Sequence, residues 1–176
     1  MPRSHPEGRD WVVERIAATT APVVIDVGCG EGTYSDVARG YRPDALWVGV
    51  EVWQPYVEQF DLWRKYDVVA VKDCRELVLP EVPFVLLCGD VLEHMPRFDA
   101  EDFLAHAKSR GAQAIMVSLP VVDYPQDCEH GGNPFEAHQA QWRFGEMYDV
   151  LAVSGRVDGW RGDVLGRFWW TPTPLD

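Results

Sequence analysis

The sequence lacks any hydrophobic run long enough to cross a membrane, and no basic segment followed by an apolar one stands at its start. Both absences argue against a membrane-spanning or secreted protein. Cysteine is scarce as well, and the cysteines show no CxxC spacing: Cys29, Cys74, Cys88 and Cys128. Because this pattern indicates neither a disulfide framework nor a zinc site, we expect free thiols and a cytoplasmic protein.

Positive charge is also in short supply. Lys and Arg together number 16 against 28 Asp and Glu, which gives a formal net charge of −12. A surface this acidic repels phosphate backbones, so the composition disfavours a nucleic-acid substrate. Arg156, Arg161 and Arg167 could still form a local basic patch that binds nucleic acid despite the negative net charge.

The most informative segment present is VVIDVGCGEG, from Val23 to Gly32. Its β-branched residues suit a strand that is covered on both faces. Gly28 and Gly30 let the backbone turn sharply and admit a ligand where a Cβ would collide. Asp26 places a carboxylate before the turn, which would repel a pyrophosphate but not a cationic ligand. The segment predicts a nucleotide-type site at the end of the first strand of an α/β sheet.

Three later apolar runs end in residues that suit the same kind of ligand. After the second run, the carboxylate of Glu51 can hold the hydroxyls of a ribose, and Trp53 can pack against an adenine. The polar residues after the third and fourth runs fall at the same edge of such a sheet. These residues are Asp73 and Cys74, then Asp90 and Val91.

The pattern Asp-x-Gly-x-Gly-x-Gly, from Asp26 to Gly32, resembles the first motif of class I S-adenosylmethionine (SAM) dependent methyltransferases. The string from Gly89 to His94 resembles their fourth motif, which lines the methyl-transfer pocket. The resemblance implies SAM as the cofactor and S-adenosylhomocysteine (SAH) as its product, with Glu51 on the ribose and Asp73 on the adenine. The expected cofactor contacts are Asp26, Gly28, Gly30, Glu51, Trp53, Asp73, Cys74, Asp90 and Val91. The Asn/Asp-Pro-Pro-Tyr/Phe signature of base-amino methyltransferases is missing, which again disfavours nucleic acid.

Each of these residues also has a plain structural interpretation. Glycines after a strand are commonly simple turns, Glu51 could be an ordinary strand-end acid, and Trp53 could be a core residue. Asp73 is equally suited to capping a short helical segment from Cys74 to Leu77. The functional interpretation depends on matching chemistry at four strand ends in the right order.

The order of elements predicts a single domain over 1–176, with a doubly wound α/β fold. We expect a seven-stranded, mostly parallel sheet with a C-terminal antiparallel hairpin and helices on both faces. The strands are predicted at 23–27, 45–51, 67–72, 83–88, 112–119, 150–157 and 164–171. The helices are predicted at 10–18 (within an N-terminal segment, 1–20), 32–39, 53–65, 99–110 and 143–148, with a helical turn at 74–77.

A long irregular segment, 120–139, follows the fifth predicted strand. A connection of this length in a compact domain is commonly functional. Since the sequence shows no separate substrate domain, we expect this segment to be a lid that grips the substrate. The N-terminal segment and the loop after the fourth strand would assist it. The string from Gly131 to His138, with Trp142, resembles a segment of small bacterial and phage methyltransferases.

His94 and His138 are the predicted catalytic residues. Methyl transfer needs a positioned nucleophile and removal of a proton, and histidine titrates near neutrality. Further candidates for the base are His130, Asp123, Glu129 and Glu136. A structural role is equally open, because His94 could hydrogen-bond the backbone and His138 could pack on Trp142 at i,i+4 spacing.

A divalent metal is an alternative at the same place. Asp123, Glu129, His130 and His138 could bind one, and the pair Glu93-His94 resembles a metal-using branch of quinone-precursor O-methyltransferases. Because ligands scattered over a loop lack the fixed spacing of a metal motif, no metal site is predicted.

The sequence therefore predicts a SAM-dependent methyltransferase that acts on an oxygen or nitrogen of a small-molecule acceptor. An enzyme of this fold that uses SAM without methyl transfer is one alternative. A non-catalytic subunit that binds SAM or SAH within a complex is another. The expected partner is the small acceptor, with no membrane and no nucleic acid, and the pattern is also compatible with a homodimer.

Overall fold

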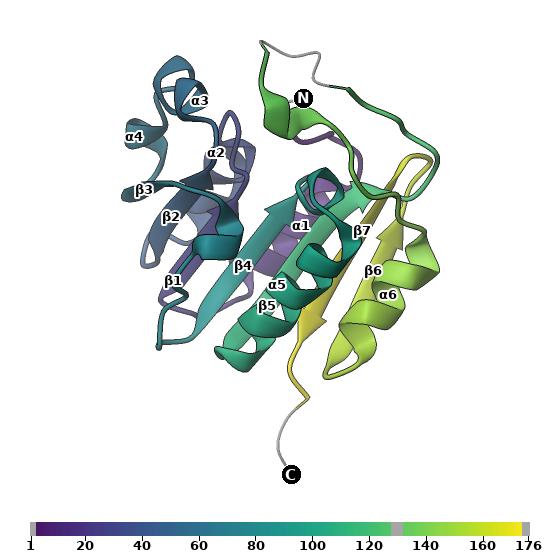
Figure 1. Cartoon of the computed structure of the whole chain (residues 1–176). Coiled ribbons are helices and arrows are strands. Elements are labelled where there is room, and N and C mark those ends of the chain that lie inside the picture. The colour runs from purple at the N-terminus through teal and green to yellow at the C-terminus, as the bar shows by residue number, and fades with distance from the viewer. Residues whose placement is uncertain (1–2, 128–131, 174–176) are drawn as a thin grey trace.

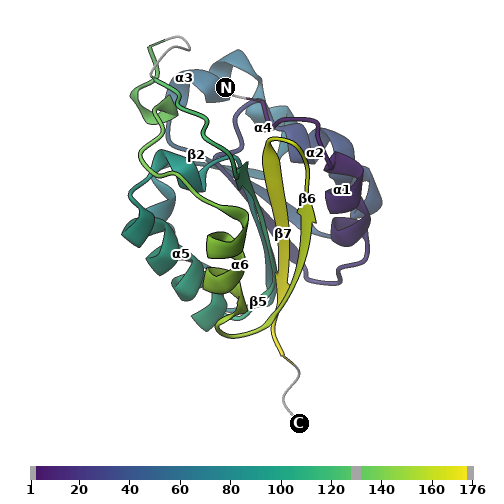
Figure 2. The same cartoon turned by 90° about the vertical axis from the view of Figure 1, so that its right-hand side faces the viewer.

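The computed structural model describes residues 3–127 and 132–173, so that Cys128, Glu129 and His130 lie outside the described residues. The predicted α/β sheet is confirmed, with helices on both faces (Figures 1 and 2). Its strands are β1 (Val23–Val27), β2 (Leu46–Glu51), β3 (Val68–Val71), β4 (Phe84–Gly89), β5 (Ala112–Pro120), β6 (Arg156–Arg161) and β7 (Leu165–Thr171).

The described strands form one seven-stranded sheet in the order β3-β2-β1-β4-β5-β7-β6. β1 pairs in parallel with β2 and β4, and the outer pairs β2–β3 and β4–β5 are parallel as well. β7 runs antiparallel between β5 and β6, which forms the predicted closing hairpin. The strand order reverses between β1 and β4, so the carboxyl ends of β1, β2 and β4 meet at one edge of the sheet. In open α/β sheets, ligands bind at this switch point.

Burial explains why the strands were visible in the sequence. The residues of β4 are all buried and those of β1 nearly so, because helices cover both faces. Such strands have continuous apolar runs. β6 lies at the edge of the sheet, and all of its residues are exposed or half-buried. An edge strand of this kind lacks a continuous apolar run and is therefore harder to recognise in the sequence than a buried strand.

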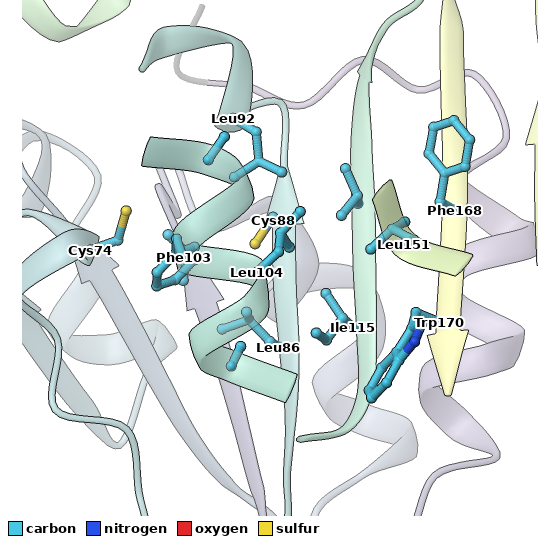
Figure 3. Packing of buried hydrophobic residues seen from close by; sticks show 14 of the residues in the cluster. Cys74, Leu86, Cys88, Leu92, Phe103, Leu104, Ile115, Leu151, Phe168 and Trp170 are labelled. Atoms are coloured by element: carbon cyan, nitrogen blue, oxygen red, sulfur yellow. The ribbon is translucent and has the colours of Figure 1, made fainter. Parts of the chain in front are cut away.

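Helices on the two faces enclose separate hydrophobic clusters. One face carries α1 (Arg9–Ala17), α2 (Thr33–Ala38), α3 (Gln54–Gln59) and α4 (Leu62–Lys65), and the other carries α5 (Arg97–Ser109) and α6 (Phe144–Ala152). Figure 3 shows Leu104 of α5 beside Cys88 of β4, and Leu151 of α6 between β5 and β7, within one buried cluster. Cys29, Cys74 and Cys88 are buried free thiols, as predicted.

Three predicted elements are wrong in extent. The helix expected at 143–148 continues to Ala152 as α6. The strand expected at 150–157 begins only at Arg156, because Met147 and Leu151 lie one turn apart on the buried face of α6. The helix expected at 53–65 is interrupted at Asp61, whose φ of 50° is left-handed and breaks the helical path between α3 and α4.

None of the helices in the described part of the chain combines the length and the apolar character that crossing a bilayer requires.

Candidate functional site

A cavity of about 250 Å³ lies at the carboxyl ends of β1 to β4. The N-terminal segment and the segment after β5 come to the same end of the sheet, at the top of Figure 1. Both contribute to the cavity wall, through Ser4 and through residues 133–136. Most of the predicted cofactor contacts line this cavity: Gly28, Gly30, Glu51, Asp73, Cys74, Asp90 and Val91. The sheet topology thus brings together residues that lie far apart in the sequence.

The first wall is the glycine turn after β1. Gly28, Gly30 and Gly32 all have positive φ angles, of 60°, 52° and 81°. A Cβ added to Gly28 would lie 2.6 Å from a methyl carbon of Val91, so the turn and the loop after β4 approach too closely for a side chain. Gly28 is therefore required for packing against Val91, and the close approach of a ligand expected at the glycines stays a prediction.

Glu51 forms the second wall, at the end of β2. Its Oε2 accepts a hydrogen bond from the backbone N–H of Gly30 at 3.0 Å, and its Oε1 accepts one from Trp53 at 2.9 Å. The side chain is buried, and burial raises the pKa of Glu51 while the two backbone bonds oppose that rise. Since each carboxylate oxygen can accept more than one hydrogen bond, the group can also accept from a diol in the cavity.

Asp26 lies beneath the turn and does not line the cavity. It is 1% exposed, and its Oδ2 accepts a hydrogen bond from the hydroxyl of Tyr66 at 2.5 Å. Burial raises the pKa of Asp26 to about 7. The structure therefore places the Asp26 carboxylate against Tyr66, and the expected cofactor contact of Asp26 stays a prediction.

Trp53 is also outside the cavity lining. Its ring centroid lies 6.4 Å from that of Phe135, a lining residue on the segment after β5. The structure therefore places Trp53 against that segment, and the expected adenine contact stays a prediction.

The third wall follows β3. Asp73 accepts a hydrogen bond from the backbone N–H of Arg75 at 2.9 Å, so it caps the short 3₁₀ turn Cys74–Glu76. The guanidinium of Arg75 also bonds Asp73, lowering the pKa of that carboxyl, and bonds Asp99 at 2.5 Å. The capping role that the sequence left open is present, and Asp73 lines the cavity as well.

The fourth wall follows β4, where Asp90 has a φ of 56°. Its Oδ1 accepts from the hydroxyl of Ser118 at 2.6 Å, and its Oδ2 accepts from the backbone N–H of His5 at 3.0 Å. A left-handed conformation is costly for a residue with a side chain, and such strain is concentrated at functional sites. Sequence reasoning missed Ser118 and His5, because neither belongs to a motif.

The N-terminal segment is held over this end of the sheet by Arg167 of β7. The buried guanidinium donates hydrogen bonds to the backbone carbonyls of His5 and Glu7 and to the hydroxyl of Tyr34, at 2.6–2.8 Å. Arg167 is 0% exposed, so the surface patch considered with Arg156 and Arg161 does not form.

His94 lines the cavity, and His138 lies next to it on the segment after β5. Their ring centroids are 4.8 Å apart in an edge-to-face arrangement. Burial lowers the pKa of His94 to about 4 and also lowers the pKa of His138. Both rings are therefore neutral at pH 7. Residues 138–143 are not helical, so the i,i+4 packing of His138 on Trp142 does not apply.

The other candidate bases are dispersed. Glu136 lines the cavity and accepts a hydrogen bond from the hydroxyl of Tyr56 at 3.1 Å. Asp123 is exposed, and its carboxylate accepts a hydrogen bond from the side chain of Gln141 at 3.4 Å. The cavity thus brings His94 and Glu136 together and leaves Asp123 outside.

No family model matches the chain, and no curated protein does. Among solved structures, the chain is similar to the PH0226 protein of Pyrococcus horikoshii OT3, with a TM-score of 0.66 at 14% identity over 96% of this chain and 92% of that one. It is similar to human N-acetylserotonin methyltransferase in complex with SAM, with a TM-score of 0.65 at 15% identity over 96% of this chain and 52% of that one.

It is also similar to magnesium protoporphyrin IX methyltransferase from Synechocystis PCC 6803 with bound SAH, with a TM-score of 0.61 at 16% identity over 94% of this chain and 84% of that one. At these identities the similarity establishes the fold. The chain has the class I SAM-dependent methyltransferase fold, as its motifs implied.

Proposed function

We propose that the chain is a SAM-dependent methyltransferase that binds SAM in the cavity at the ends of β1 to β4. Its methyl group would pass to an oxygen or nitrogen of a small-molecule acceptor. The observation that carries the proposal is the carboxylate of Glu51, which is buried at the end of β2 and fixed by the N–H groups of Gly30 and Trp53. A carboxylate held in this way suits the two hydroxyls of a ribose.

The charge of the cavity supports SAM over a phosphate-bearing nucleotide. Its lining carries the carboxylates of Glu51, Asp73, Asp90 and Glu136. Its lining cations are Lys72 and Arg75, of which Arg75 is paired with Asp73 and Asp99. A site with this excess of negative charge attracts the cationic sulfonium and ammonium groups of SAM and repels a pyrophosphate.

The residues present fit the cofactor in shape as well. Gly28, Gly30 and Val91 line the cavity together, so the glycine turn would present its backbone to the cofactor and Val91 an apolar contact beside it. The solved methyltransferase structures with SAM or SAH bound share this fold. When bound, SAM supplies a methyl group that its sulfonium has already activated for displacement.

The acceptor would lie on the far side of Asp90. A smaller cavity of about 40 Å³ shares Asp90 and His94 with the larger one and adds Glu93, Tyr124 and His138. His94 therefore stands between the two cavities. We assign His94 and His138 to positioning the acceptor group for in-line attack, because orientation is the main task that the protein has in this reaction.

Turnover tests this proposal. The purified protein would be incubated with isotopically labelled SAM and a deproteinised small-molecule extract, and SAH formation and labelled products would be measured. We expect SAH to accumulate together with a labelled small molecule. Stable 1:1 SAM binding with no SAH in any fraction would contradict turnover and favour a non-catalytic subunit. SAM breakdown without a methylated product would favour an enzyme of another chemistry.

A further inference from the structure

A cluster of three potential metal ligands lies beside the proposed acceptor cavity. Glu93, His94 and His138 each present a ligand atom, and these atoms all lie within 4.8 Å of one another. Glu93 and His94 belong to the 3₁₀ turn Leu92–His94 after β4, whereas His138 comes from the segment after β5. Only the folded chain brings them together.

The carboxyl group of Glu93 needs an explanation. The residue is 2% exposed, and its Oε2 has no hydrogen-bond partner among the described residues. A buried polar oxygen without a partner is costly, so most such atoms are satisfied by protein, water or an ion. A carboxylate oxygen of Glu93 lies within 4.8 Å of a ring nitrogen of each histidine, and together these atoms make a suitable set of ligands.

Each of the two histidines has a backbone carbonyl within hydrogen-bond distance of its Nδ1. Nδ1 of His94 lies 3.3 Å from the carbonyl oxygen of Ala137, and Nδ1 of His138 lies 2.7 Å from that of Tyr124. A ring whose Nδ1–H donates to a carbonyl keeps its lone pair on Nε2. The same outer contact fixes the ring orientation and tautomer of metal-ligating histidines.

The protein backbone keeps the cluster assembled. The carbonyl oxygen of Glu93 accepts hydrogen bonds from the N–H groups of Gln139 and Ala140, at 2.8 and 3.0 Å. The side chain of Gln139 donates to the carbonyl of His94 at 2.8 Å. These bonds tie the segment that carries His138 to the turn that carries the other two residues.

We propose that Glu93, His94 and His138 form a binding site for a divalent transition-metal cation. Two imidazoles and one carboxylate suit Zn²⁺ or Mn²⁺ better than Ca²⁺, which prefers oxygen ligands alone. Three protein ligands leave room in the coordination sphere for water or a substrate oxygen. Ligand bonds of about 2.0–2.2 Å require the three side chains to close slightly around the ion.

This inference goes beyond the proposed function, because binding of the ion requires neither SAM nor turnover. If the function also holds, His94 and His138 position the acceptor through the ion. The site borders the cavity that we assign to the acceptor, since Glu93, His94 and His138 all line it.

Calorimetric titration of chelator-treated, metal-free protein with Zn²⁺, and separately with Mn²⁺, tests the site. We expect one ion per chain and a melting temperature that rises with the concentration of the metal. Glu93→Gln and His138→Asn should each weaken binding at least about tenfold. The matched control is His106→Asn, which removes an exposed histidine from α5 and should bind as the wild type does.

Glu93→Gln is nearly isosteric, so a folded variant is expected, and its circular dichroism spectrum checks this. Absence of saturable binding to the wild type would overturn the site. Metal affinities that are unchanged in both Glu93→Gln and His138→Asn would also overturn the site. SAM titration of the same sample separates the two proposals, because a protein that binds SAM but no metal contradicts only the metal site.

Discussion

Asp26 and Glu51 are both buried carboxylates on neighbouring strands, yet their surroundings give them different tasks. Glu51 faces the cavity and is held by two backbone N–H groups. Asp26 faces Tyr66 beneath the glycine turn and does not reach the cavity. A motif fixes the residue type at such positions, but only the packing shows whether the carboxylate faces the cavity or another buried side chain.

The pKa of Asp26 predicts how stability depends on pH. The folded-state pKa is about 7, above the ordinary value of 3.8, so the folded chain binds the extra proton between these values. Stability must therefore fall as pH rises from about 4 to 7, by up to about 1.4 kcal/mol per pH unit. The side chain of Asp26→Asn stays neutral, so the stability of this variant should lack the part of the pH dependence that comes from Asp26. Urea unfolding from pH 5 to 8 measures the free energy of unfolding of both proteins.

The comparison is the free energy of unfolding of the variant minus that of the wild type. This difference should shift in favour of Asp26→Asn as pH rises toward 7, and then level off. Asp102→Asn, at an exposed position on α5, is the matched control and should follow the wild type. Parallel curves for Asp26→Asn and the wild type would show that Asp26 ionises as an ordinary carboxyl does.

At the scale of elements, the N-terminal segment is part of the site through contacts with a distant strand. Arg167 of β7 donates to the carbonyls of His5 and Glu7, and the N–H of His5 holds Asp90 at the cavity. The carboxylate of Glu7 accepts from the N–H of Leu165 at 3.0 Å in return. The segment and the β6–β7 hairpin therefore depend on each other.

Removal of the Arg167 guanidinium should release this segment. Arg167→Met leaves two carbonyls and the hydroxyl of Tyr34 without their buried donor, at a cost on the order of 1–3 kcal/mol for each unsatisfied group. We expect faster hydrogen–deuterium exchange over residues 4–8, with little change in β1 and β4. The exposed Arg156→Met is the control, and unchanged exchange in the Arg167 variant would contradict the account.

Elements with a local cause were predictable from the sequence. Continuous apolar runs gave the buried strands β1 and β4, and the glycine pattern gave the turn between β1 and α2. The predicted strand at 150–157 was wrong because a short apolar run fits either a strand or a buried helix face. The contacts of Arg167 with His5 join residues more than 160 positions apart, and such pairings leave no periodic signal.

At the scale of the whole molecule, charge and topology favour the same ligand. The strand order creates one switch point, and the ends of four strands, the N-terminal segment and the segment after β5 converge there on a cavity with an acidic lining. The chain as a whole carries a net charge of −12. A cationic cofactor and a small acceptor suit such a molecule, whereas a polyanion would be repelled.

The candidate site could be anticipated only in part. Strand-end residues were predictable because parallel strands end at one edge, and Glu51, Asp73 and Asp90 do line the cavity. The grouping of Glu93 with His94 and His138 was not predictable, because it depends on the path of an irregular segment. Residues on such segments are brought together by long-range packing, which spacing in the sequence does not encode.

The most direct test of the central claim is calorimetric titration with SAM, and separately with NAD and ATP, of the wild type and Glu51→Gln. The account predicts saturable 1:1 binding of SAM, comparable binding of SAH, and no binding of NAD or ATP. Loss of a charged, buried acceptor should weaken SAM binding at least about tenfold, whereas the exposed Glu58→Gln on α3 should bind as the wild type does. Binding of NAD or ATP instead of SAM, or SAM affinity unchanged in Glu51→Gln, would contradict the account.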